Sequence, residues 1–130
     1  MTKEKLLLIL LMAFFISIRL FGVDLPYHQD EQKYVGRGVA LQGVGVTSGH
    51  PPLLGIIMTG AGFFFGDKFF RLMSLLFGIG SFLLLCVLMR ILFDNKTALW
   101  AGFLYAISPY GVWASLMVDV DGAVLPFFAF

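Results

Sequence analysis

The feature that most constrains this chain is a run of 18 uncharged residues between Arg71 and Arg90. A run of this length is long enough for a helix to cross the hydrocarbon core of a bilayer. Charged residues make up 13% of the chain and hydrophobic residues 59%, whereas a soluble domain has about 25% charged residues. The sequence therefore predicts an all-α protein built from polytopic transmembrane helices.

Charge and cysteine content exclude several kinds of partner. Nine Lys and Arg residues stand against eight Asp and Glu residues, which gives a formal net charge of +1. This balance leaves no basic excess for nucleic-acid binding. The only cysteine, Cys86, lies in an apolar run, so the chain has neither an internal disulfide nor a thiolate metal site. We expect Cys86 either to face lipid or to pack as a small hydrophobic side chain.

Hydropathy predicts about three complete spans and the start of a fourth, at residues 6–23, 69–93, 97–114 and 121–130. No small-x-small cleavage site follows the first apolar run, so it is expected to be an uncleaved span rather than a signal peptide. Lys3 and Lys5 precede it, which places the N-terminus in the cytoplasm. Arg19 lies near the outer end of this span, where we expect its side chain to reach toward the membrane surface rather than to contact a phosphate group.

Residues 24–52 are then an extracytoplasmic loop. The apolar segment 53–65 that follows has two interpretations: it crosses the membrane, or it is a juxtamembrane helix at the interface. Its 13 residues rise only about 20 Å, which favours the second. If segment 53–65 does not cross the membrane, the turn Asp94–Lys96 is cytoplasmic. The acidic side chains within the segments 24–52 and 115–122 then face the outer side.

The last ten residues enter an apolar segment that reaches only about half of a bilayer core. We therefore interpret the chain as the N-terminal part of a longer polytopic protein. Residues 1–130 alone are expected to insert in the membrane but to lack the activity of that longer protein.

The densest polar cluster follows the first span, between Asp24 and Tyr34. Its adjacent carboxylates, Asp30 and Glu31, could bind a divalent cation, or one of them could accept a proton from a hydroxyl group. A solvated loop with a capped helix over residues 30–42 explains the same pattern. Spacing alone does not separate these interpretations.

Several motifs occur in a fixed order along the hydropathy profile: a first span, Asp30-Glu31, Tyr34, His50-Pro51-Pro52-Leu53 and Phe65-Gly66. This order resembles the GT-C superfamily of membrane glycosyltransferases, in particular the dolichyl-phosphate-mannose protein mannosyltransferases and the bacterial lipid A aminoarabinose transferases. In that superfamily an Asp-Glu pair lies in the first external loop and a further Asp follows the third span. Asp119 and Asp121 both fit that last position.

The resemblance implies inverting transfer of a sugar from a polyprenyl-phosphate donor to a lipid, glycan or protein acceptor on the outer face, with the plasma membrane as the expected location. Asp30 is then the candidate general base, and Glu31 either orients the site or binds a metal ion. His50 is a candidate metal ligand or a contact to the donor phosphate. A divalent metal ion is the one cofactor that the resemblance leaves open.

The remaining candidates for substrate binding lie on the expected loop helix. Lys33 and Arg37 are four residues apart and could contact the donor phosphate, although a solvated helix face explains them as well. Tyr34 lies beside them in the sequence. The alternative function is a non-catalytic polytopic membrane protein, either a scaffold or part of a transporter, and the reading frame after Phe130 would distinguish the two.

Overall fold

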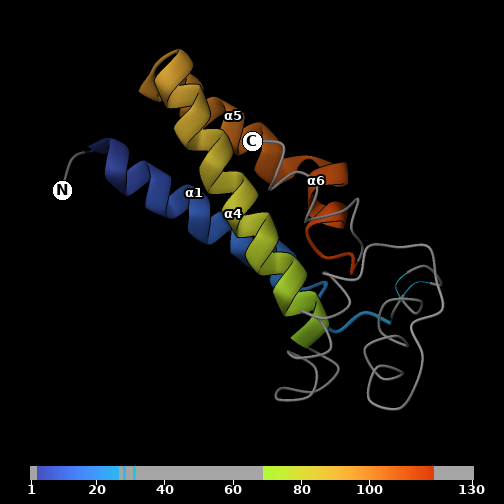
Figure 1. Ribbon diagram of the computed structural model, residues 1–130. Coiled ribbons are helices and arrows are strands. Elements are labelled where there is room, and N and C mark those ends of the chain that lie inside the picture. Colours follow the sequence, from blue (N-terminus) through green and yellow to red (C-terminus); the bar gives the residue numbers. More distant parts are fainter. Residues whose placement is uncertain (1–2, 27, 29–30, 32–68, 119–130) are drawn as a thin grey trace, which may run out of the picture.

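The computed structural model describes residues 3–26, 28, 31 and 69–118 (Figure 1). In these residues the chain forms four helices and no strand: α1 (Lys3–Leu20), α4 (Phe69–Leu92), α5 (Asn95–Ile107) and α6 (Pro109–Ala114). The all-α prediction is confirmed for this part of the chain. The expected helices over 30–42 and 53–65, and the expected start of a further span at 121–130, lie outside the described residues.

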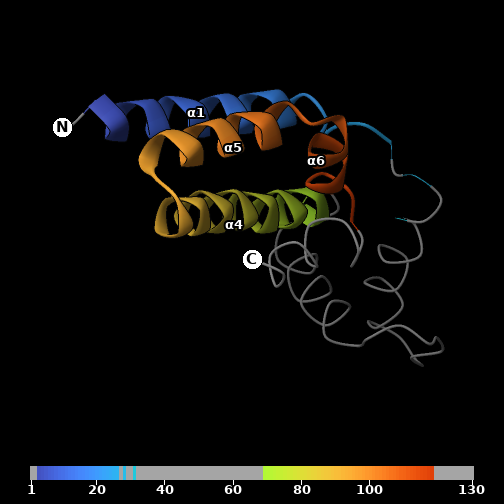
Figure 2. The ribbon, with the colours of Figure 1, turned by 90° about the horizontal axis from the view of Figure 1, so that it is seen from above.

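The three longer helices form a bundle in which α5 contacts both α1 and α4 (Figure 2). At one end, which we call the turn end, Asn95 at the start of α5 donates a hydrogen bond to Glu4 in the first turn of α1, at 2.8 Å. At the opposite end, which we call the loop end, Arg71 of α4 donates to the carbonyl of Gly22 just after α1, at 2.7 Å. The last turn of α1 and the first turn of α4 therefore lie together.

Helix α4 coincides with the predicted span at 69–93. Among the described helices, its stretch Phe70–Leu92 is the one that is long and apolar enough to cross a membrane. Helix α1 is 18 residues long and carries charges near both of its ends. Its length corresponds to about 27 Å, close to the thickness of the hydrocarbon core.

In the structure, the expected span over 97–114 is divided into two helices, α5 and α6. The chain leaves the helix at Ser108, whose φ of −59° and ψ of 123° are not helical, and Pro109 begins α6. Proline disfavours the helical conformation in the residue before it and lacks the N–H that a continuing helix would use. The Ser108 hydroxyl then caps α6 by accepting a hydrogen bond from the Gly111 amide at 3.2 Å. As a result α5 has only 13 residues, or about 20 Å.

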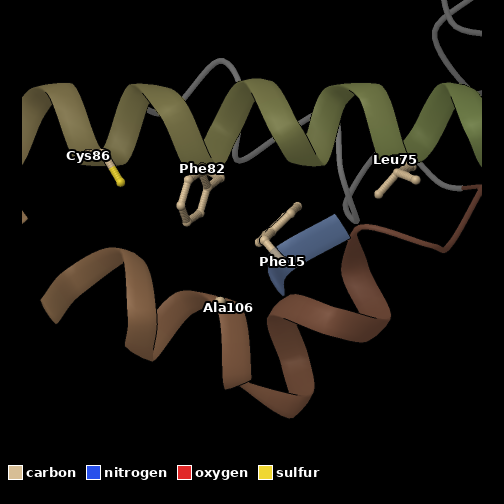
Figure 3. Packing of buried hydrophobic residues seen from close by; sticks show 5 residues of the cluster. All are labelled: Phe15, Leu75, Phe82, Cys86 and Ala106. Carbon is tan, nitrogen blue, oxygen red and sulfur yellow. The ribbon is translucent and has the colours of Figure 1, made fainter. Parts of the chain in front are cut away.

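The core lies where α1, α4 and α5 meet, and Figure 3 shows five of its residues. Phe15 of α1 is fully buried, and its ring lies 4.9 Å from that of Phe82 of α4. Leu75, Cys86 and Ala106 complete the cluster. Cys86 is buried, so the second of its two interpretations, a packed small hydrophobic side chain, is the correct one.

Glycines allow the helices to approach closely in two places. A Cβ atom on Gly78 of α4 would lie 2.5 Å from the Cβ atom of Ser115, and one on Gly102 of α5 would lie 2.8 Å from the sulfur of Cys86. Small residues at helix contacts are typical of membrane proteins, where close packing replaces the hydrophobic effect as the source of association. The first of these contacts brings the end of α6 against α4 at the loop end.

Candidate functional site

The loop end contains a buried ion pair between two segments that are far apart in the sequence. Arg71 lies in the first turn of α4, and its Nη2 atom is 2.9 Å from Oε2 of Glu31. The two residues are 5% and 2% exposed. A charge removed from water is tolerated only when it is paired and hydrogen-bonded. The pair therefore fixes Glu31 of the expected outer loop onto α4.

Glu31 accepts two further hydrogen bonds, so both of its carboxylate oxygens are engaged. The amide of His28 donates to Oε2 at 2.7 Å, and the amide of Val118 donates to Oε1 at 3.1 Å. One side chain thus joins the segment after α1, the start of α4 and the segment after α6. These contacts favour an orienting role for Glu31 over direct metal binding.

Arg71 holds the same region from the other side of the ion pair. Besides Glu31, its guanidinium donates to the carbonyls of Gly22, at 2.7 Å, and Pro26, at 2.9 Å. The planar guanidinium can satisfy several acceptors at once because its five N–H donors have a fixed geometry. The chain that leaves α1 is consequently fixed against α4 before it reaches Glu31.

A small pocket of about 140 Å³ lies at this end of the bundle. Glu31, Arg71 and His28 line it together with Trp113 and several apolar residues from the segments after α1 and α6. Trp113 is 55% exposed, so part of its indole is open to a ligand. A charged pair beside an exposed aromatic ring combines polar contacts with a flat apolar surface, and both are suited to a sugar or its phosphate.

Arg19 does not reach toward the membrane surface, and that prediction is wrong. Its side chain is fully buried, with Nε donating to the Ser115 hydroxyl at 2.6 Å and Nη1 to the carbonyls of Phe15 and Ala106 at 3.0 and 3.2 Å. The guanidinium carbon also lies 3.4 Å from the centre of the Phe15 ring. Arg19 points into the bundle because these carbonyls, the hydroxyl and the ring replace the water that it would otherwise seek.

The buried charges at the loop end are therefore unequal among the described residues. Arg19 forms no ion pair with a carboxylate of this part of the chain, and its Nη2 atom is buried without a hydrogen-bond partner. Arg71 is paired with Glu31. Among the described residues, the loop end thus has two buried guanidinium groups and one buried carboxylate.

Most of the residues selected from the sequence lie outside the described residues: Asp30, Lys33, Tyr34, Arg37, His50, Asp119 and Asp121. Of the candidates, Glu31 is described, and it lies at the centre of the contacts above. Sequence reasoning missed Arg71, Arg19 and Ser115 as members of this site. The sequence did contain a signal for the two arginines. A charged side chain within or beside a membrane span is energetically costly, so an ionisable residue at such a position is a functional candidate.

Among the described residues, no group of three or more His, Cys, Asp or Glu side chains lies close enough to hold a metal ion. The charged contacts at the loop end are instead an ion pair and hydrogen bonds to backbone groups. These contacts fix the backbone at the loop end.

Comparison with known proteins identifies the family. Residues 49–130, more than half of the chain, match the family model described as dolichyl-phosphate-mannose-protein mannosyltransferase. No curated protein and no solved structure showed significant similarity. The family match supports glycosyltransferase activity of the GT-C type and confirms the resemblance drawn from the motifs. The chain therefore belongs to the dolichyl-phosphate-mannose-protein mannosyltransferase family.

Proposed function

We propose that the protein transfers a sugar from a polyprenyl-phosphate donor to an acceptor hydroxyl on the extracytoplasmic face, with inversion at the anomeric carbon. The family match supports sugar transfer. The observation that carries the finer proposal is the anchoring of Glu31 by Arg71, His28 and Val118. This anchoring fixes the backbone at the point in the sequence where the candidate base occurs.

Asp30 is the proposed general base. It is joined by one peptide bond to Glu31, and adjacent Cα atoms are about 3.8 Å apart. A general base must lie within hydrogen-bond reach of the attacking hydroxyl, and a small displacement reduces its effect strongly. Glu31 therefore acts as a positioning residue, while Asp30 takes the proton of the acceptor.

Asp119 is the proposed third carboxylate in preference to Asp121. It directly follows Val118, whose amide donates to Glu31, whereas Asp121 is three peptide bonds away from Val118. The contact between Val118 and Glu31 thus joins the two chain segments next to Asp30 and Asp119. A second carboxylate in this region can orient the acceptor or the sugar by hydrogen bonds.

Among the described residues of the loop end, buried positive charge exceeds buried negative charge, and this supports a donor that carries a phosphate. Negative charge develops on the leaving phosphate as the sugar is transferred, and preorganised cationic groups stabilise it. Arg19 and Arg71 supply positive charge at the loop end, and we propose that Lys33, Arg37 and His50 add contacts to the donor, with Tyr34 beside the acceptor. Because both oxygens of Glu31 are engaged, we do not assign it as a metal ligand.

The arrangement of the helices supports an extracytoplasmic site. The last turn of α1 and the first turn of α4 both lie at the loop end, as expected if the segment between them begins and ends on one side of the membrane. Lys3 and Lys5 lie in the first turn of α1, at the opposite end. The positive-inside rule then places the turn end in the cytoplasm and the loop end outside.

Replacement of the proposed base tests this function. In membranes that contain the complete natural protein, with radiolabelled polyprenyl-phosphate-mannose as donor, we expect Asp30→Asn to lower the transfer rate about 10²–10⁴-fold, the usual contribution of a general base. The amide preserves size and hydrogen bonding but cannot accept the proton.

The matched control is Asp94→Asn, which removes a carboxylate at the turn end and leaves a side chain that caps a helix equally well. Its transfer rate should equal that of the unmodified protein. A loss of less than about tenfold for Asp30→Asn, with normal amounts of protein in the membrane, would show that Asp30 is not the base.

A further inference from the structure

The turn end carries an apolar groove that the proposed transfer reaction does not use. The groove has a volume of about 390 Å³ and lies between α1 and α5. Leu7 and Leu11 line it from α1, and Leu99, Trp100 and Phe103 from α5; Lys96, in the first turn of α5, is its one charged lining residue. Its lining is therefore suited to a hydrocarbon chain with a negative group at one end.

A second, more polar hollow of about 220 Å³ adjoins the groove and shares Leu99 with it. Lys5 of α1 and Arg90 of α4 line this hollow, with Glu4 and Asn95. The Glu4 carboxylate accepts the hydrogen bond from Asn95 at 2.8 Å. Lys5, Arg90 and Lys96 thus surround the start of α5 and outnumber the acidic groups there.

The acidic groups of the turn end are already engaged in the fold. Asp94 accepts a hydrogen bond from the Thr97 amide at 2.6 Å and caps α5. Lys96 also attracts the Asp94 carboxylate, but the three cations that line the groove and the hollow outnumber Glu4 and Asp94, the two carboxylates at the described turn end. Charge complementarity favours a phosphate group here.

Trp100, one of the two aromatic residues that line the groove, is placed as in a membrane-interface belt. Trp100 is 59% exposed and lies about one turn after Lys96. Tryptophan and lysine near the end of a helix are typical of the boundary between head groups and acyl chains. This pattern favours an occupant with both an apolar tail and a charged head.

We propose that the groove binds an acyl chain of an anionic phospholipid and that Lys5, Arg90 and Lys96 bind its phosphate. Basic hollows between helices on the cytoplasmic side are suited to anionic head groups. A second copy of the chain is a poorer occupant, because a symmetric contact would bring two identical sets of these cations together. The site lies at the opposite end of the bundle from the proposed donor site, so the two proposals can fail separately.

Fluorescence quenching tests this proposal. Trp113→Phe leaves Trp100 as the single tryptophan of the chain. In phosphatidylcholine vesicles we expect brominated phosphatidylglycerol to quench Trp100 more strongly than brominated phosphatidylcholine at the same mole fraction. Lys96→Gln should reduce the lipid preference about two- to fivefold, as expected for one basic residue near an anionic head group, whereas Lys96→Arg should retain it.

Two controls separate this site from general attraction to the membrane. Lys68→Gln removes a lysine that precedes α4 and should leave the preference unchanged. Trp100→Phe leaves Trp113, at the loop end, which should show no preference. Helix content measured by circular dichroism confirms that each variant is folded.

Three results would overturn the proposal. Equal quenching by the two brominated lipids would show that the groove does not select an anionic head group. Weak quenching by both would show that protein, such as a second copy, covers the groove. A preference that survives the combined replacement of Lys5, Arg90 and Lys96 by glutamine would place the anionic lipid elsewhere.

Discussion

The two ends of the helix bundle use polar residues in opposite ways. At the loop end the polar contacts are buried and join distant segments, as between Arg71 and Glu31, 40 residues apart, and between Arg19 and Ser115, 96 residues apart. At the turn end the contacts are exposed, as where Asp94 caps the amide three residues later. Buried polar contacts are costly to form and strict in geometry. The difference indicates that the loop end is built to hold a rigid site, while the turn end keeps its hydrogen-bonded polar groups at the surface.

This contrast explains how a short outer segment can be held rigidly. A single carboxylate, Glu31, takes hydrogen bonds from three segments, and Arg71 fixes the chain that leads to it. An active site placed next to such an anchor needs little further ordering when the substrates bind. The contrast between the two ends can be tested by removing matched groups from each of them.

The largest effect on stability is expected at the buried ion pair. Arg71→Gln leaves the Glu31 carboxylate buried without its cation, and we expect the free energy of unfolding to fall by about 3–5 kcal/mol. Unfolding in mixed detergent micelles measures this loss. Replacing both residues by methionine should recover much of it, since no unpaired charge remains. A loss below about 1 kcal/mol for the single variant would mean that the pair is exposed to solvent.

A smaller effect is expected at Arg19. Arg19→Lys retains the positive charge but loses the planar set of donors that reaches Ser115 and the carbonyls of Phe15 and Ala106. We expect a destabilisation of about 1–3 kcal/mol, the usual cost of leaving buried polar groups unsatisfied. The matched control is Arg90→Lys at the turn end, which should change little. Equal effects of the two substitutions would remove the distinction between the ends.

The smallest effect is expected at Asp94. The hydrogen bond from the Thr97 amide lowers the pKa of the Asp94 carboxyl below its usual range. Because the pKa of this carboxyl is lower in the folded state than in the unfolded state, the ionised carboxylate stabilises the fold at pH values above the usual pKa range. This stabilisation is lost as the pH falls through the lowered pKa. The protection factor of the Thr97 amide in hydrogen exchange should fall over that acidic range. In Asp94→Asn the protection should not depend on this titration.

Hydropathy predicted the long elements of the fold but not the way in which they face each other. The positions of α1 and α4 followed from the lengths of the apolar runs and the charges between them, whereas the expected turn Asp94–Lys96 is shorter in the structure, because α5 already begins at Asn95. The break at Ser108–Pro109 was overlooked because the apolar run continues through it, although proline restricts the preceding residue regardless of hydropathy. A hydropathy profile contains no information about local backbone geometry.

The sequence predicted only part of the site, because local patterns do not show which distant residues meet. Glu31 was selected because two adjacent carboxylates near a membrane surface suggest chemistry, whereas Arg71 served only as the boundary of a span and Arg19 as a residue near the membrane surface. Their buried contacts depend on which helix face each one occupies and on distant carbonyl and hydroxyl groups. Such long-range pairing is not encoded in the local pattern.

The central claim is that the loop end faces the outer side of the membrane and the turn end faces the cytoplasm. Single cysteines introduced at Gln42, in the expected outer loop, and at Asn95, at the turn end, in a Cys86→Ala background test it most directly with an impermeant thiol reagent on intact cells. We expect Gln42→Cys to be labelled from outside and Asn95→Cys only after permeabilisation. Labelling of both from outside, or of Asn95→Cys alone, would contradict the account.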